Sequence, residues 1–237
     1  MPTDAASPRL TPILGLFLAF TALLAALYVL AGRVAFVGAH LTELYAVLFL
    51  VIPHVWAART GAEVPLFGPL ARGLLWGAAV SVAVLGLFAL GYELYFRLLC
   101  AGELPASWNL GRSCAALHGF RFPGWSATGH LFLIHAVAVA LPEEYFYRGF
   151  LQPLVLRSPT LAGLGGHRRL AVAVVLQAAC FAAGHALVDF NPMRAAVFFP
   201  GLLFGALAAG SGGLWAPILF HAAANVVSET LETGFFG

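Results

Sequence analysis

Long apolar segments alternate along the chain with short turns rich in Gly, Pro and Arg. Each of the longer segments approaches the roughly 20 apolar residues that an α-helix needs to cross a membrane. The pattern predicts an all-α protein, a polytopic membrane helix bundle of about seven transmembrane helices. Six to eight are compatible with it, because Pro53 interrupts the second segment and the sixth is short. The segments are residues 10–31, 37–58, 70–99, 129–156, 170–188, 195–209 and 214–231.

The composition supports this placement in a membrane. Hydrophobic residues make up 61% of the 237 residues and charged residues 9%, whereas soluble domains average about 25% charged. A soluble fold of this length could not bury so much apolar surface. The formal net charge of +2 is too small to indicate nucleic acid as a partner. We expect the partners to be the lipid bilayer and a membrane-associated protein or peptide substrate.

The sequence predicts one integral-membrane domain, residues 10–237, preceded by a short polar tail at 1–9. It shows no internal repeat and no soluble domain. All 12 basic residues are arginine, and Ala, Gly and Leu are abundant, a bias typical of GC-rich bacterial genomes. We therefore expect a multi-pass protein of the bacterial inner (cytoplasmic) membrane. A small excess of arginine on the side of the turn 157–169 favours the cytoplasm for that side.

The three cysteines have no spacing typical of a metal site. Cys180 lies in an apolar segment and is expected to be a small core residue. Cys100 and Cys114 lie in the longest polar segment, 100–128, which also contains Trp108 and has the composition of an interfacial loop. The two cysteines could form a disulfide if this loop faces an oxidising compartment, and would otherwise be free thiols.

Three charged residues lie close together inside the fourth apolar segment: Glu143, Glu144 and Arg148. Each charge at membrane depth costs roughly 2.5–3.5 kcal/mol on insertion scales, so the group requires an explanation. Glu144 and Arg148 are four residues apart and can pair on one face of a helix. That pair leaves Glu143 without a local partner, which makes the segment a candidate functional site. We place the catalytic core at about residues 129–231.

Two further polar clusters lie in later segments, each with two residues spaced by four. Phe181 precedes His185 in the fifth segment, and His221 precedes Asn225 in the seventh. Residues at i and i+4 project from one face of a helix, so His221 and Asn225 are expected to point the same way. A carboxylate, two histidines and an asparagine in an apolar bundle suit hydrolysis of a peptide bond. The carboxylate can deprotonate water, a histidine can orient it or protonate the leaving amine, and an amide can donate to the oxyanion.

At these positions the sequence resembles the intramembrane glutamic proteases of the CAAX prenyl endopeptidase and bacteriocin-processing (CPBP, Abi) family. The family's first motif is two glutamates followed, after three residues, by arginine. Its second is an aromatic residue with histidine four residues later, and its third is histidine with asparagine four residues later. All three motifs occur here in the family's order. The implied catalytic residues are Glu143, His185, His221 and Asn225, and the implied supporting residues are Glu144, Arg148 and Phe181.

The resemblance also implies a task for each residue. Glu143 would activate the water with His185 beside it, while His221 and Asn225 would hold the water and the oxyanion. The second glutamate and the arginine would form the supporting pair. The CAAX label implies a prenylated cysteine in the substrate. The bacterial composition instead favours C-terminal anchoring or sorting tails, or exported peptides.

Other interpretations of the same residues stay open. Glu143, His185 and His221 could bind zinc, although the sequence contains no HExxH motif and we expect no cofactor. The protein could instead be a non-catalytic membrane immunity or scaffold protein that binds a partner in the same groove. A transporter is a third class, and the lack of two-fold internal symmetry argues against it. His130 and His135 precede the glutamates and are predicted to be bystanders.

Overall fold

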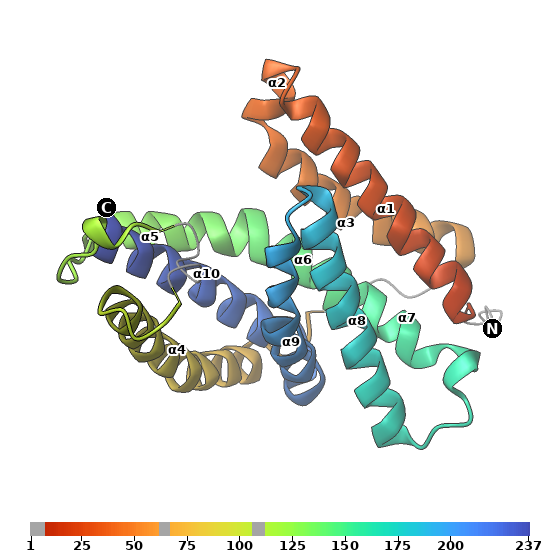
Figure 1. Ribbon diagram of the computed structural model, residues 1–237. Helices are drawn as coiled ribbons and strands as arrows, with labels where there is room; N and C mark the ends of the chain where they lie inside the picture. Colours follow the sequence, from red (N-terminus) through yellow and green to blue (C-terminus); the bar gives the residue numbers. More distant parts are fainter. Residues whose placement is uncertain (1–7, 62–66, 106–111) are drawn as a thin grey trace.

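The computed structural model describes residues 8–61, 67–105 and 112–237 (Figure 1). Within these ranges all regular structure is helical and no strand occurs, as the apolar pattern predicts. Trp108 and residues 1–7 of the predicted tail lie outside the described residues. The α-helices are α1 (Leu10–Ala31), α2 (Ala35–Ala39), α3 (Leu41–Thr60), α4 (Leu70–Cys100), α5 (Trp125–Ile134), α6 (Leu141–Glu144), α7 (Gln152–Arg157), α8 (Gly166–Val188), α9 (Phe198–Ser211) and α10 (Trp215–Phe236).

Six helices in the described part of the chain are long and apolar enough to cross a membrane. One of them is the continuous helix Trp125–Arg157, called the crossing helix below, which contains α5, α6 and α7. The predicted seventh segment corresponds to α10, which has 22 residues but carries Glu229 and Glu232 near its end. The architecture is therefore the predicted polytopic helix bundle. The six are Leu10–Ala31, Leu41–Thr60, Leu70–Cys100, Trp125–Arg157, Gly166–Val188 and Pro192–Ser211.

Several helix boundaries differ by a few residues from those predicted, among them the start of the second segment at Leu41, the start of the fifth at Gly166 and the end of the seventh at Phe236. The backbone explains two others. The fourth segment begins at Trp125 rather than at residue 129, because Gly124 takes a φ of 104° and ends the preceding loop. The sixth begins at Pro192, where a 3₁₀ turn leads into α9. Proline suits the first position of a helix, and the side chain of Asn191 caps the turn by accepting from Met193 N.

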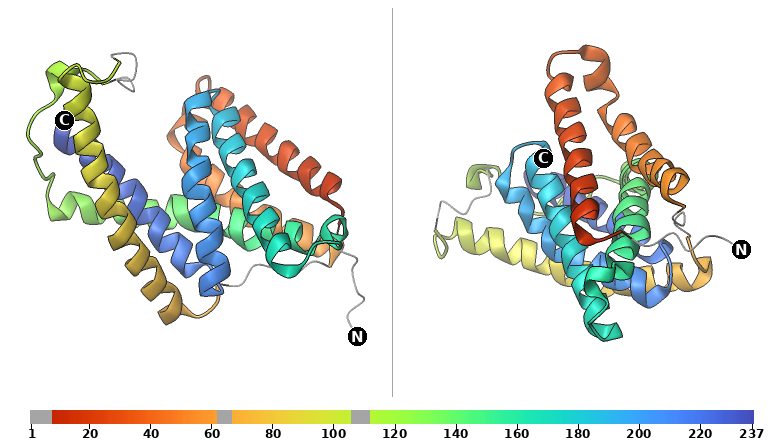
Figure 2. Two further views of the ribbon diagram at one scale, coloured as in Figure 1. Left: turned by 60° about the horizontal axis from the view of Figure 1, so that its bottom comes forward. Right: turned by 90° about the vertical axis from the view of Figure 1, so that its right-hand side faces the viewer.

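Five helices form a row that the crossing helix spans. α4 packs along α10, α10 lies against α9, α9 against α8, and α8 against α1 (Figure 1, Figure 2). The first half of the crossing helix contacts α10, and its second half contacts α8 and α3. The glutamates therefore lie where this helix passes from α10 towards α8.

Aromatic side chains fix the second half of the crossing helix. Phe146 lies 4.5 Å from Phe20 of α1 and 5.5 Å from Phe49 of α3, measured between ring centroids. All three rings are buried. Such tilted and edge-to-face pairs contribute about 0.5–1.5 kcal/mol each beyond the area they bury. The helices before residue 125 thus hold the backbone that carries the glutamates.

A disulfide links the end of α4 to the segment that follows it. Cys100 and Cys114 form a disulfide, so the structure contains the first of the two alternatives left open by the sequence. The loop is also attached to the end of α10, because His118 N donates to Phe235 O at 3.0 Å. Cys180 is a buried free thiol, in agreement with its predicted place in the core.

Candidate active site

The glutamates lie in a section of the crossing helix that departs from α-helical geometry. The four residues of α6 lie between two π-helical segments, His135–Ala140 and Tyr145–Leu151. Pro142 and Pro153 each come two residues after the end of such a segment. Because proline cannot donate a backbone hydrogen bond, the wider π-helical turns accommodate the interrupted pattern. The sequence analysis predicted neither segment, although π-helical turns are frequent at functional sites.

Glu144 and Arg148 form the buried ion pair that their spacing predicts. Arg148 Nη1 lies 2.9 Å from Glu144 Oε1, and neither side chain is exposed. Arg148 Nη2 also donates to Gly201 O at 3.3 Å. Its guanidinium carbon lies 4.3 Å from the ring centre of Phe181 and 4.8 Å from that of Phe204. The aromatic residue of the second motif therefore covers the arginine of the first.

His221 connects this ion pair to the third motif. Its Nδ1 lies 2.7 Å from Glu144 Oε1, and its ring stacks on Phe204 with an interplanar angle of 14°. Because an ionised carboxylate only accepts hydrogen bonds, Nδ1 carries a hydrogen, and in a neutral ring Nε2 is then an acceptor. The contact joins residues 77 positions apart, and nothing in the spacing of the motifs indicated it.

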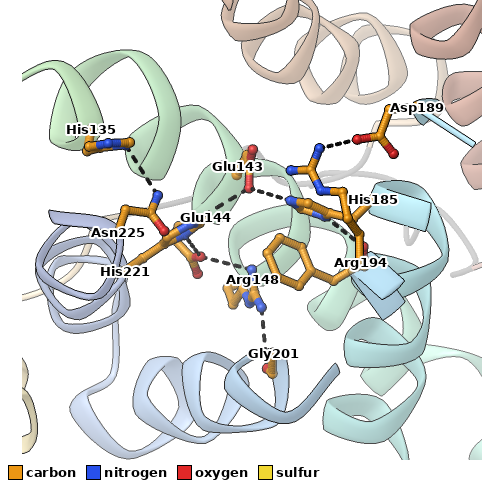
Figure 3. A network of polar contacts seen from close by, with 11 residues as sticks. His135, Glu143, Glu144, Arg148, His185, Asp189, Arg194, Gly201, His221 and Asn225 are labelled. Carbon is orange, nitrogen blue, oxygen red and sulfur yellow. Dashed lines mark hydrogen bonds and ion pairs between the residues drawn. The ribbon is translucent and has the colours of Figure 1, made fainter. Parts of the chain in front are cut away.

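Glu143 faces both histidines (Figure 3). Its Oε2 is buried, has no hydrogen-bond partner among the described residues, and lies 3.8 Å from His185 Nε2 and 4.0 Å from His221 Nε2. His185 Nδ1 donates to Phe181 O at 2.9 Å, so Nε2 of this neutral ring is an acceptor as well. Three acceptors therefore converge at distances too long for direct hydrogen bonds. A water molecule has two donor hydrogens and could bridge two of these three acceptors.

Asn225 lies beside His221 on α10, as their spacing predicts (Figure 3). Its Nδ2 lies 3.4 Å from His135 Nδ1, and Nε2 of the same histidine lies 3.1 Å from Glu229 Oε2. The sequence analysis assigned His135 no role, but the structure places it next to the asparagine of the third motif. This contact also joins residues far apart in the chain, so helical spacing could not reveal it.

The three motifs thus meet at one place in the fold, contributed by the crossing helix, α8 and α10. The sequence profile of the family described as Type II CAAX prenyl endopeptidase Rce1-like matches residues 125–227. This part of the chain is therefore similar to the CAAX protease family. The match begins at the first residue of the crossing helix and includes all three motifs. No curated protein and no solved structure matches the chain.

The match to this family supports a CAAX-type intramembrane protease, and the long apolar helices support a multi-pass membrane protein. The helices before residue 125 lie outside the match. They nevertheless contribute one polar contact next to the family's first motif. His54 Nε2 of α3 lies 3.0 Å from Tyr145 Oη, and Tyr145 directly follows the paired glutamates. No sequence motif indicated this contact.

Two glycines let aromatic side chains pack against the CAAX-family motifs. A Cβ on Gly184 would lie 2.6 Å from Tyr147 Oη, and one on Gly201 would lie 3.2 Å from the ring of Phe181. Tyr147 and Phe181 are both buried, with ring centroids 5.0 Å apart. A side chain at position 184 would therefore displace the Tyr147 hydroxyl, and one at position 201 would require the Phe181 ring to shift by a few tenths of an ångström.

The donor types of a zinc site are present, since Glu143, His185 and His221 supply one carboxylate and two imidazoles. Among the residues that the structure describes, however, no three His, Cys, Asp or Glu side chains are grouped as a metal site. The two nitrogen-to-oxygen separations of 3.8 Å and 4.0 Å are the closest contacts of Glu143 with these imidazoles.

Proposed function

We propose that this protein is an intramembrane endopeptidase that hydrolyses a peptide bond of a membrane-associated substrate, using water activated by Glu143. One observation carries the proposal: Glu143 Oε2 is buried without a partner among the described residues, 3.8 Å from His185 Nε2 and 4.0 Å from His221 Nε2. A water held by these acceptors would donate one hydrogen bond to the carboxylate and one to an imidazole. The family of residues 125–227 independently supports a protease.

In the proposed reaction, Glu143 takes a proton from the water as the water oxygen attacks the carbonyl carbon of the substrate. A C–O bond forms, and the carbonyl electron pair moves to the oxygen. Asn225 donates to this oxyanion through the Nδ2 hydrogen that does not face His135. The electron pair of the oxyanion then re-forms the C=O bond, the C–N bond breaks with its electron pair leaving on nitrogen, and the proton held by Glu143 passes to this leaving amine. One of the two acceptor imidazoles accepts the second hydrogen of the water and so holds it in the attacking position.

The supporting pair acts on this reaction through His221. The carboxylate of Glu144 fixes the Nδ1–H tautomer of that imidazole, so that Nε2 stays available to the water. Arg148, 2.9 Å away, balances the charge of this carboxylate in a place that water does not reach.

We propose a C-terminal membrane-anchoring or sorting tail, or an exported peptide, as the substrate, in the inner membrane of a bacterium. The family's name refers to prenylated CAAX sequences. The arginine-only basic composition favours a bacterial source, in which prenylated proteins are not expected. We propose no metal and no other cofactor.

The proposal is tested with purified protein in lipid bilayers and two internally quenched peptides. One peptide ends in a farnesylated CAAX sequence, and the other ends in an apolar anchor. Wild type is compared with Glu143→Gln and with Glu93→Gln, a matched control at an exposed glutamate that pairs with Arg97 on α4. We expect Glu143→Gln to lose cleavage by about 10²–10⁴-fold and the control to retain it. Wild-type turnover by Glu143→Gln would remove Glu143 as the base.

Two further measurements separate the alternatives. Loss of cleavage on chelation, with recovery on adding zinc, would assign the reaction to the zinc-dependent version. Membrane proteomes of a deletion strain that expresses either wild type or Glu143→Gln are then compared, which also identifies the natural substrate. Identical proteomes, together with no cleavage of either peptide, would favour a non-catalytic immunity or scaffold protein.

A further inference from the structure

Two polar side chains beside the site have no part in the reaction as described so far. His135 is the first residue of the π-helical segment before the glutamates, and Glu229 follows Asn225 by four residues on α10. Figure 3 shows the ring of His135 directed at the asparagine amide. We propose that His135 and Glu229 are positioning residues, which fix the orientation of the Asn225 amide so that it donates to the oxyanion. The inference rests on the proposed function, since it needs Asn225 as a donor.

The donor and acceptor capacities of Glu229, His135 and Asn225 allow one pattern of hydrogen bonds between them. The carboxylate of Glu229 only accepts, so His135 Nε2, 3.1 Å away, carries a hydrogen. In the neutral ring, His135 Nδ1 is then a bare acceptor. Of the two ends of the Asn225 amide, only Nδ2 can donate to it, and Nδ2 is the atom that lies 3.4 Å from Nδ1. The chain from carboxylate to imidazole to amide therefore has a single direction.

Orientation matters because the two ends of an amide have nearly the same shape and opposite hydrogen-bonding roles. With Nδ2 held by His135, its second hydrogen is free to donate to the oxyanion. A flipped Asn225 would instead present its carbonyl oxygen to the developing negative charge. The contact with His135 therefore selects the catalytically useful orientation from two that would otherwise be similar in energy.

The placement of these residues in the fold supports a role in rate rather than in stability. His221, Asn225 and Glu229 follow one another at intervals of four and so share one face of α10. The π-helical segment that begins with His135 packs against the same helix. The side chain of Glu229 is 53% exposed, and a polar contact as exposed as this one contributes little to folding. The contact between Glu229 and His135 is therefore expected to affect the orientation of the Asn225 amide and not the stability of the fold.

The test is a double-mutant cycle on the peptide that wild type cleaves. His135→Phe keeps the ring shape and removes the acceptor, and should lower kcat about 10- to 100-fold with KM changed less than about twofold. In an Asn225→Ala background, the same substitution should change kcat less than about twofold, because the group it positions is gone. Independent losses that multiply in the double variant would overturn the proposal. His130→Phe, on the same helix at an exposed position, is the control and should retain wild-type kcat.

A second measurement does not depend on activity. Nitrogen-15 NMR of labelled histidine should find His135 neutral with hydrogen on Nε2, and Glu229→Ala should shift it towards a mixture of tautomers. Glu232→Gln, a matched control on α10 whose native partner is Arg112, should leave the tautomer unchanged. A hydrogen on His135 Nδ1 in wild type would overturn the inference, whatever the peptides show. Inactivity of Glu143→Gln together with wild-type kcat in His135→Phe would leave the proposed function standing and reject the positioning role.

Discussion

Replacing one partner of the buried pair of Glu144 and Arg148 should destabilise the protein strongly, and replacing both should recover much of the loss. Neither side chain is exposed, and their closest atoms are 2.9 Å apart. In Glu144→Gln, the guanidinium of Arg148 keeps its hydrogen bond to Gly201 O at 3.3 Å and its contacts with the aromatic rings. It loses the negative charge that compensates its own. Breaking a buried pair in this way costs about 3–5 kcal/mol, because a charge is left uncompensated.

That cost translates into a measurable change in the melting midpoint. For a chain of this size, 1 kcal/mol corresponds to about 2–4 °C, so Glu144→Gln should melt roughly 6–20 °C below wild type. The loss in melting midpoint for Arg148→Met should lie towards the smaller end of this range, since the Glu144 carboxylate keeps its hydrogen bond from His221 Nδ1 at 2.7 Å. The double variant contains neither charge and should melt above both single variants. It should stay below wild type by at least the lost bond to Gly201 O, about 1 kcal/mol.

Cys180 provides the assay. It is a free thiol, 7% exposed, on α8, while the other two cysteines are joined in the disulfide. A thiol-reactive dye that fluoresces on coupling will report the exposure of Cys180 as the protein is heated in detergent without reductant. Cys180→Ser is the blank, and Glu93→Gln is the control for an exposed glutamate. A double variant that melts at or below its less stable parent would refute the assignment of Glu144 and Arg148 as a charge-compensating pair.

Two further substitutions and one labelling experiment test other parts of the structure. Gly184→Ala should lower the melting midpoint by several degrees, because its Cβ would lie 2.6 Å from Tyr147 Oη; an unchanged midpoint would mean that the tyrosine can move aside. His185→Ala should reduce kcat about 10²–10⁴-fold without changing the midpoint, and kcat near that of wild type would remove it from the site. A membrane-impermeant maleimide should label Cys100 and Cys114 in intact cells only after reduction, because an oxidised loop is expected on the outer side. Labelling that requires a permeabilised inner membrane would reverse this orientation.

Contacts within one helical turn could be predicted from the sequence. The pairing of Glu144 with Arg148 follows from their spacing by four, and the shared direction of His221 and Asn225 follows from the same periodicity. The membrane-spanning architecture follows from the length and polarity of the segments, since a bilayer requires long apolar helices. These features depend only on the periodicity of the helix and on the length and polarity of each segment. Both can be read from a single sequence.

Contacts between distant helices could not be predicted in the same way. The bond from His221 to Glu144 and the approach of His135 to Asn225 depend on how α10 packs against the crossing helix. Family resemblance suggested that the motifs meet but did not say which atoms pair. The π-helical segments were also missed, although Pro142 signals a disturbed helix, because proline shows where the α-helical pattern fails and not what replaces it.

The disturbed geometry around the glutamates has a consequence for how the protein responds to warming. Amide hydrogens in an unbroken apolar helix such as α8 exchange with solvent mainly when the whole structure opens. The section from 141 to 153 contains two prolines and a π-helical segment, so fewer α-type backbone bonds hold it. Its amides should exchange earlier than those of α8. Activity would then be lost on warming before helicity, and would return on cooling without complete refolding.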